Sequence, residues 1–372
     1  MSETIHRLRE EISALSVELL THLNQRTARV LEIAKEKRRL SLPTRDPYRE
    51  SQLLDHLVQS NQGPLDAATV RTLFRQIFDA SVMLQDRSGQ QKLCVSAAHG
   101  AKVSVSVRGH VIGDGRPIYI AGPCAVESAE QIEQAAAGLA AMGVRFFRGG
   151  TFKLRTSPHT FQGLGEPGLK LLADACRRHQ LVSISEATSP HNLEVVARYV
   201  DIIQIGTRNM YNYALLRAAG QTGMPVLLKR GLSATLDEWL HAAEHIAIAG
   251  SERIILCERG IRTFARETRG TLDLSIVPLA QKASRLPVIV DVSHAAGRRD
   301  ILSDLACAAF AVGAAAVMIE VHPDPDLAQS DAEQQLNLAD FAQLQRFVRS
   351  RLRANLEALA CDEVPTTTAR TA

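Results

Sequence analysis

The chain has 372 residues, of which 43 are basic and 40 acidic, so its formal net charge is only +3. No dense lysine or arginine tract with interleaved aromatic residues is visible, which argues against nucleic-acid binding. No signal-peptide pattern is visible in the charged amino-terminal residues, and apolar stretches are interrupted before the roughly 20 residues that a membrane span needs. We expect a cytoplasmic protein that binds neither nucleic acid nor membrane, with a barrel-sized domain of about 250 residues and a smaller one.

Residues 1–86 are predicted to form an all-helical domain of three helices. Apolar residues recur at spacings of three and four in a long first helix, which ends near Pro43 and Pro47. A second helix is expected over residues 49–59, and a third begins near Leu65. Three helices with so long a first member make a thin core, so we expect pairing with a second copy. The period of the first helix is carried by Ile5, Leu8, Ile12, Leu15, Leu19, Leu20 and Leu23.

The rest of the chain has the rhythm of a (β/α)8 TIM barrel. Residues 87–115 are interpreted as a linker and a short β-hairpin, because apolar and polar residues alternate between turn glycines. Over residues 116–355, eight apolar runs alternate with segments of helical spacing, which favours a closed parallel barrel. Residues 356–372 are expected to be a disordered tail. The eight runs are PIYIAG, VRFFRGG, LVSISEA, DIIQIG, PVLLKRG, RIILCERG, PVIVDVSH and AAVMIEVH.

Chemically distinctive residues stand where these strands run out into loops, the end at which barrel enzymes keep their active sites. Cys124, His294, Glu320 and Asp331 offer sulfur, nitrogen and oxygen donors, a mixed set that suits a Mn, Fe, Co or Zn ion. Such an ion with an open position would polarise an aldehyde carbonyl. A ring of cations suits a phosphorylated, carboxylated substrate. The ring consists of Arg148, Lys153, Arg155, Arg208, Lys229 and Arg259.

A class I aldolase is the alternative barrel chemistry. It would use Lys153 or Lys229 as a Schiff-base amine and would leave the four metal-ligand candidates without a purpose. Any one of these candidates, taken alone, is more often a core cysteine or a hydrogen-bonded polar residue. The metal prediction therefore depends on their joint placement at strand ends.

From about Lys102 to Arg349, the chain resembles the type Iβ class of 3-deoxy-D-arabino-heptulosonate 7-phosphate (DAHP) synthases. The blocks that carry the resemblance are AGPCAVES, FRGGTFKLRTSPHTFQGLG, IGTRNM, LLKRG, ERG, DVSHAAG and MIEVHPDPDLAQSD, in the family's order. The resemblance implies condensation of phosphoenolpyruvate with erythrose 4-phosphate. Leu154 stands where the family usually has proline. Leucine would loosen the loop without removing a contacting group. Octulosonate phosphate synthases share the barrel, but the KLRTS loop favours the four-carbon aldose.

This resemblance implies a role for each strand-end residue. It assigns the divalent metal to Cys124, His294, Glu320 and Asp331, and it assigns phosphoenolpyruvate to Arg148, Lys153, Arg208, Lys229 and Arg259, with Lys153 also catalytic. It assigns the aldose phosphate and its hydroxyl groups to Arg155, Thr156 and Ser157.

Over residues 5–86, the order and spacing of REEISALSVELL, NQR, AKEK, RDPYRE and SVMLQ resemble an AroQ-type chorismate mutase. The resemblance implies rearrangement of chorismate to prephenate, for which positioning and charge complementarity suffice. Ser16 stands where the family often has aspartate. The implied site has Arg9 from the partner chain, Arg26 and Arg49 on carboxylates, Lys37 and Gln85 at the ether oxygen, Glu50 on the hydroxyl, and Asp46 and Ser81 completing it.

The fusion of the two domains suggests regulation. A site for a late intermediate is tethered to the enzyme of the first step, so we hypothesise feedback inhibition of the barrel when the helical domain binds chorismate or prephenate. A helical domain that only senses this ligand, without turnover, is the alternative. By family analogy, we expect a homo-oligomer with dimeric mutase domains, assembled as a tetramer.

Overall fold

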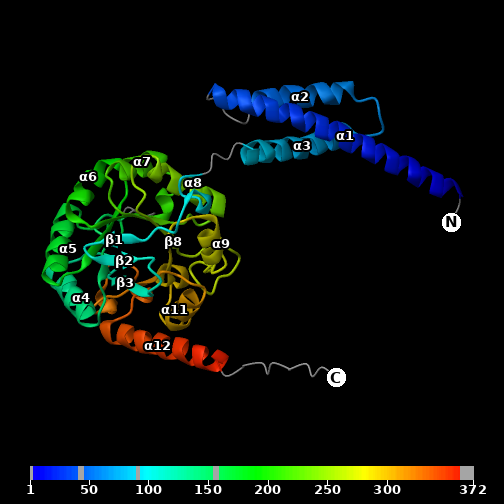
Figure 1. Cartoon of the computed structure of the whole chain (residues 1–372). Helices are drawn as coiled ribbons and strands as arrows, with labels where there is room; N and C mark the ends of the chain where they lie inside the picture. Colours follow the sequence, from blue (N-terminus) through cyan, green and yellow to red (C-terminus); the bar gives the residue numbers. More distant parts are fainter. Residues whose placement is uncertain (1–2, 41–45, 89–92, 154–158, 361–372) are drawn as a thin grey trace, which may run out of the picture. The chain divides into compact units, whose positions relative to one another are not determined.

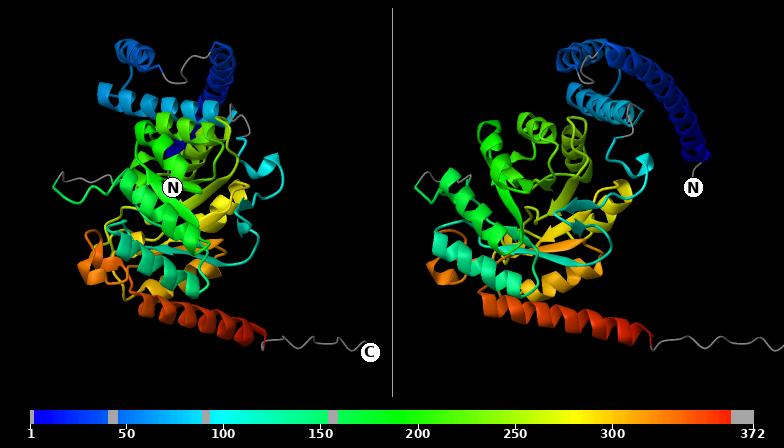
Figure 2. Two further views of the ribbon diagram at one scale, coloured as in Figure 1. Left: turned by 90° about the vertical axis from the view of Figure 1, so that its left-hand side faces the viewer. Right: turned by 60° about the vertical axis from the view of Figure 1, so that its left-hand side comes forward.

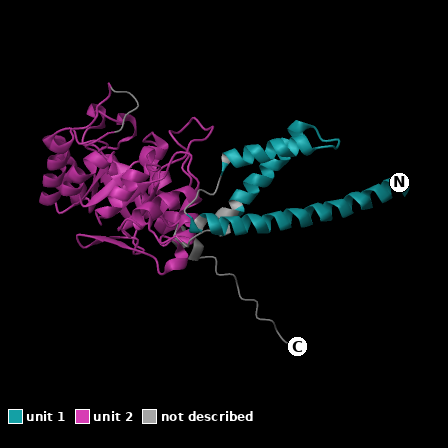
Figure 3. Ribbon diagram, turned by 90° about the horizontal axis from the view of Figure 1, so that it is seen from above, with its two compact units in different colours: residues 1–91 teal, residues 92–372 magenta. Residues whose placement is uncertain are grey.

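The chain forms two compact units, Met1–Gln91 and Lys92–Ala372, shown in different colours in Figure 3. None of the helices in the described part of the chain has the length and hydropathy of a membrane span. The computed structural model describes residues 3–40, 46–88, 93–153 and 159–360, apart from the side chains of residues 38, 47, 83, 85–88 and 355–360.

The first unit consists of the three predicted helices, α1 (Glu3–Arg39), α2 (Pro47–Ser60) and α3 (Ala67–Ser88) (Figure 1). Asp46 starts α2, because its side chain accepts a hydrogen bond from the backbone N of Arg49 at 3.0 Å. Within the described residues, few apolar side chains of this unit are fully buried, and the first half of α1 exposes its apolar stripe. The core is therefore as thin as the helical pattern indicates.

The second unit is a closed barrel of eight parallel strands, which confirms the predicted (β/α)8 fold (Figure 1). Neighbouring strands follow one another in the chain, and the last strand pairs with the first to close the barrel. All eight predicted runs form strands. They are β3 (Ile118–Gly122), β4 (Phe146–Arg148), β5 (Val182–Ala187), β6 (Ile202–Ile205), β7 (Val226–Lys229), β8 (Ile254–Glu258), β9 (Val288–Asp291) and β10 (Ala316–Glu320).

Helices form the outer layer of the barrel, as two turned views show (Figure 2). Capping boxes begin α6 and α8, where Ser189 and Thr235 bond reciprocally with the residue three positions on. The last helix continues to Ala360, past the predicted start of the tail at residue 356, and residues 361–372 lie outside the described part. The helices are α4 (Ala129–Ala141), α5 (Glu166–Arg178), α6 (Pro190–Tyr199), α7 (Tyr213–Gln221), α8 (Leu236–Ala247), α9 (Ile276–Ala283), α10 (Val292–Ala296), α11 (Leu302–Ala311) and α12 (Leu338–Ala360).

The predicted hairpin closes the amino-terminal end of the barrel. Its strands, β1 (Val105–Val107) and β2 (His110–Ile112), pair antiparallel. Their buried side chains pack with the first residues of several barrel strands, such as Phe146 and Val182, in one apolar cluster. The opposite end, where the strands run out into loops, remains available for a site.

The hairpin plug yields a stability prediction. Ile112 is fully buried in this cluster, so Ile112→Ala should lower the free energy of unfolding of the barrel by about 2–5 kcal/mol. Urea unfolding followed by far-UV circular dichroism measures the change. Ser106→Ala, on the exposed face of the same hairpin, is the control and should leave the midpoint unchanged. Equal midpoints for both variants would show that the hairpin does not stabilise the barrel.

Candidate active site

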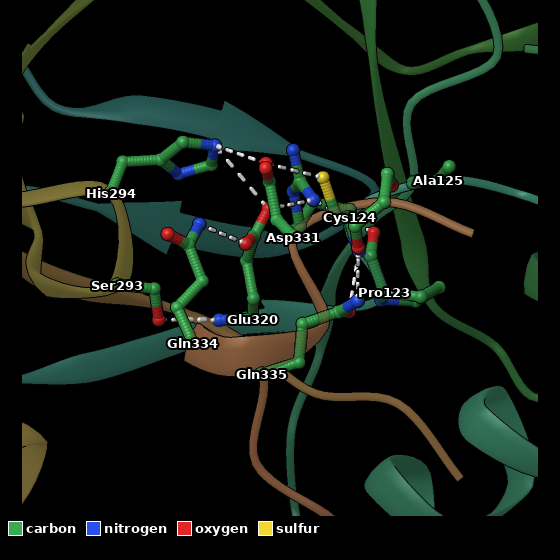
Figure 4. Close-up of polar contacts among 12 residues, drawn as sticks. Pro123, Cys124, Ala125, Ser293, His294, Glu320, Asp331, Gln334 and Gln335 are labelled. Atoms are coloured by element: carbon green, nitrogen blue, oxygen red, sulfur yellow. Dashed lines mark hydrogen bonds and ion pairs between the residues drawn. The ribbon is translucent and has the colours of Figure 1, made fainter. Parts of the chain in front are cut away.

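The four predicted metal ligands converge at the carboxyl end of the barrel (Figure 4). Cys124 follows β3, His294 lies on α10 directly after β9, Glu320 ends β10, and Asp331 lies in the loop that follows. One donor atom from each lies within 4.8 Å of the others. The sulfur of Cys124 is 3.1 Å from Asp331 Oδ2, and His294 Nε2 is 3.4 Å from Glu320 Oε1.

Arg148, which is buried, and Arg269, which is partly exposed, compensate the two carboxylates of this cluster. Arg148 donates from Nη1 to Glu320 Oε1 at 2.9 Å and to the carbonyl oxygen of Pro123 at 2.7 Å. Burial alone would raise the pKa of Glu320, but the charges of His294 and Arg148 hold that pKa below its ordinary value. The pKa of Asp331 is likewise lowered, because Arg269 and His294 outweigh the effect of burial. Both carboxylates are therefore ionised at neutral pH.

Burial determines the protonation of the nitrogen and sulfur donors, His294 and Cys124. Burial lowers the pKa of His294, so its ring is neutral at pH 7, the form that binds metals, and carries the charge that acts on the carboxylates only at lower pH. Asp291 Oδ2 lies 2.8 Å from its Nδ1. This contact leaves Nε2 directed at the cluster. Burial raises the pKa of the Cys124 thiol to about 12, so a metal would have to displace its proton. Lys153 Nζ lies 2.8 Å from the same sulfur.

The donor set fits a divalent transition metal. Two ionised carboxylates that meet a thiol within 4.8 Å repel one another unless positive charge lies among them. A sulfur and an imidazole are poor ligands for Mg or Ca, whereas the combination of S, N and O donors suits Mn, Fe, Co or Zn.

A cavity of about 230 Å³ opens beside the cluster, and His294 and Asp331 belong to its wall. Its lining is dominated by basic side chains, which a substrate with phosphate and carboxylate groups would neutralise. The predicted residues Arg148, Lys153, Arg208, Lys229 and Arg259 all line it. The predicted residues Arg155, Thr156 and Ser157, together with Leu154, lie outside the described part of the chain.

Ion pairs position the two basic residues at the end of β7. The Lys229 ammonium pairs with Asp291, which is also the partner of His294. The next residue, Arg230, bonds from Nη1 to Glu258 Oε2 at 2.9 Å and to Asp273 Oδ2 at 2.8 Å. Lys229 of LLKRG and Arg259 of ERG therefore line the cavity. Their neighbours Arg230 and Glu258 form the ion pair that joins the two strands.

The cavity wall also contains residues that the sequence reasoning missed. Glu186, at the end of β5, accepts a hydrogen bond from Gln204 Nε2 at 3.2 Å. Gly206 leaves room for it, because a Cβ at that position would lie 2.1 Å from Glu186 Oε1. The strand-end rule could have found Glu186, which stands in the run LVSISEA. Arg262 and Arg269 come from the β8–α9 loop, for which the strand pattern gives no signal.

A second cavity, of about 210 Å³, lies within the helical unit. The predicted residues Arg26, Lys37, Asp46, Arg49, Glu50 and Ser81 line it together with apolar side chains. Arg26 donates to Ser81 Oγ at 2.7 Å, and its guanidinium lies 5.3 Å from the centre of the Phe78 ring.

Two residues predicted for this second site are not seen at its cavity. Arg9 lies 17 residues before Arg26 on the same helix, which corresponds to about 25 Å along the axis, so it does not reach the cavity of its own chain. The side chain of Gln85 is outside the described part.

A closed (β/α)8 barrel with a cavity lined by basic side chains and a candidate metal-ligand cluster at the carboxyl ends of its strands has the architecture of a TIM-barrel enzyme. The chain belongs to the DAHP synthetase I family, whose model matches residues 88–354. Residues 8–86 match the chorismate mutase type II family. The protein thus contains a DAHP synthase domain and a chorismate mutase domain, as a bifunctional enzyme of aromatic biosynthesis does.

Individual relatives agree with this assignment. The chain is 50% identical over 233 residues to phospho-2-dehydro-3-deoxyheptonate aldolase of Thermotoga maritima, covering 63% of this chain and 69% of that protein. It is 33% identical over 268 residues to 2-dehydro-3-deoxyphosphooctonate aldolase of Magnetococcus marinus, covering 65% and 90%. The crystal structure of the Thermotoga maritima DAHP synthase matches with a TM-score of 0.67 at 45% identity, covering 70% of this chain and 76% of that one.

Proposed function

We propose that the barrel condenses phosphoenolpyruvate with erythrose 4-phosphate in a metal-dependent reaction, giving DAHP and phosphate. The observation that carries this proposal is the shared wall between the metal-ligand cluster and the cationic cavity, since His294 and Asp331 belong to both. The aldehyde of erythrose 4-phosphate and the phosphoenolpyruvate would then be held side by side. The identity to the Thermotoga maritima enzyme supports erythrose 4-phosphate over the longer aldose of the octulosonate relatives.

The proposed roles follow the charges of the cavity. Cys124, His294, Glu320 and Asp331 would hold a Mn, Fe, Co or Zn ion, which supplies Lewis acidity toward the aldehyde oxygen. Phosphoenolpyruvate would be bound by the basic residues, with arginine forks suited to its phosphate and lysines to its carboxylate. The enol carbon attacks the aldehyde carbon, and the aldehyde oxygen takes up a proton. A water adds to the resulting oxocarbenium carbon and loses a proton, and the C–O bond to phosphate then breaks to leave the ketone. Glu186 would orient that water within the cavity wall.

A chelation experiment tests the barrel reaction. We expect EDTA to abolish the loss of phosphoenolpyruvate absorbance with erythrose 4-phosphate, and Mn²⁺ to restore it. Cys124→Ala should lower the rate roughly 1,000-fold, because about 4 kcal/mol of charge stabilisation is lost with the metal. Cys176→Ala is the control, since this cysteine is buried in α5 and makes no part of the cluster.

Two results would contradict the proposal. Turnover that EDTA does not reduce would show that the reaction needs no metal ion. Consumption of phosphoenolpyruvate with arabinose 5-phosphate but not with erythrose 4-phosphate would show that the barrel has the activity of its octulosonate relatives.

We propose that the helical domain, residues 1–86, rearranges chorismate to prephenate in a dimer, as part of a cytoplasmic homo-oligomer that reaches a tetramer. Arg26, Arg49 and Lys37 give the cavity the positive charge that a dicarboxylate needs. Arg9 would come from the partner chain, because it lies too far along α1 to serve its own cavity. The exposed apolar stripe of α1 supports pairing, with Ile12 and Leu15 each 62% exposed.

Mixed dimers test this arrangement. Arg26→Met and Arg9→Met should each lower chorismate turnover roughly 100- to 1,000-fold by removing one charged contact. Mixing the two variant chains should restore part of the activity, because a mixed dimer contains one intact site. Arg29→Met, on the exposed face of the same helix, should behave as wild type. The partner-chain role of Arg9 would be refuted by mixtures no more active than their components.

We propose further that occupation of the helical cavity by chorismate or prephenate inhibits the barrel. The support is the presence of both domains in one chain, which joins a site for a late intermediate to the enzyme of the first reaction. Feedback of this kind needs a coupling free energy between the two sites, typically 1–3 kcal/mol.

Prephenate inhibition provides the test. In the wild-type chain, prephenate should slow phosphoenolpyruvate consumption, with an inhibition constant that rises about 5- to 150-fold in Arg26→Met. Deletion of residues 1–90 should abolish the inhibition. Equal inhibition of wild type, variant and truncated chain would place the inhibitor in the barrel and end the regulatory proposal.

A further inference from the structure

We propose that two consecutive glutamines, Gln334 and Gln335, are positioning residues that hold three of the four metal ligands in their converging arrangement. The proposal rests on the proposed metal site and extends it to residues that would not themselves touch the metal. Both side chains are buried, and each uses both ends of its amide to join segments far apart in the sequence. Figure 4 shows the two side chains beside the cluster.

The Gln335 amide links the loops that carry Cys124 and Asp331. Its Oε1 accepts a hydrogen bond from the backbone N of Cys124 at 2.8 Å, and its Nε2 donates to the carbonyl oxygen of Ser330 at 2.8 Å. Ser330 precedes Asp331, whose backbone is left-handed at a φ of 52°. Left-handed backbone is uncommon in residues other than glycine, although aspartate adopts it more readily than most. Gln335 therefore fixes the backbone on both sides of the contact between the sulfur and the carboxylate.

The Gln334 amide orients Glu320 and, through an arginine, Asp331. Its Nε2 donates to Glu320 Oε2 at 2.6 Å, and its Oε1 accepts from Arg269 Nη1 at 3.0 Å. The same guanidinium nitrogen lies 3.4 Å from Asp331 Oδ1. Because Arg148 donates to the other oxygen of Glu320, each oxygen of that carboxylate has a donor, which leaves it one orientation.

The two glutamines can act together because the loop returns to the barrel at this point. Leu336 forms a parallel bridge with Val321, in which Leu336 N donates to Glu320 O at 2.9 Å and His322 N donates to Leu336 O at 2.9 Å. Residues 334–336 are thereby anchored beside the end of β10. A neutral amide also orients a carboxylate without adding another negative charge to a cluster that already contains two.

Metal affinity tests the proposal in the full-length chain. Methionine has nearly the length of glutamine but makes neither hydrogen bond. We expect Gln334→Met and Gln335→Met each to weaken Mn²⁺ and Co²⁺ binding by about 10- to 100-fold, measured by competition with a chromophoric chelator. Gln335→Met should also weaken the sulfur-to-cobalt absorption band, because the backbone of Cys124 loses its partner. Gln329→Met is the matched control, since that side chain is exposed on the same loop.

The outcomes separate this proposal from the metal site itself. Variants that bind both ions as tightly as the wild type, yet melt at a lower temperature without metal, would show that the glutamines only stabilise the loop. A wild-type chain that binds neither ion would instead contradict the metal site. If one variant folds poorly, affinity measured on the other still decides the question, because each amide serves a different ligand.

Discussion

The site depends on one electrostatic constraint: several acidic donors meet at a point where Cys124 and Glu320 are fully buried. The thiol follows β3, the two carboxylates come from β10 and the loop after it, and all three converge with an imidazole within 4.8 Å. Like charges repel strongly in such an environment, so cations must be supplied nearby and held by further hydrogen bonds. That requirement accounts for much of what surrounds the cluster. The cations that meet it are Arg148, Lys153 and Arg269.

Buried acids also hold the basic residues that make the cavity positive. Asp291 contacts both the imidazole of His294 and the ammonium of Lys229, so one buried carboxylate orients a metal-ligand candidate and a substrate-binding candidate together. Arg148 has a comparable double position, because it pairs with Glu320 and also lines the cavity. The metal-ligand cluster and the anion cavity are therefore a single charge network, and a substitution in either is expected to affect the other.

The helical unit has basic residues around its cavity but few buried apolar side chains. Arg26, Lys37 and Arg49 line its cavity, while the first half of α1 exposes apolar residues. Both features have one explanation in the proposed dimer, where a second copy would cover the apolar stripe and bring Arg9 to the site. The barrel, by contrast, has a closed sheet and a continuous core of its own.

Local pattern alone determined the three helices, the eight strands and the hairpin, because each depends on the period of its own apolar residues. The same pattern predicted that Cys124, His294, Glu320 and Asp331 lie together, since the carboxyl ends of parallel strands meet at one end of a barrel. Only the tertiary structure decided the roles of Gln334 and Gln335 and the pairing of Arg148 with Glu320. Arg148 and Gln335 make contacts between different βα units, whereas Gln334 reaches back to the end of the strand that precedes its own loop. No periodicity within one segment encodes which of these partners a side chain will meet.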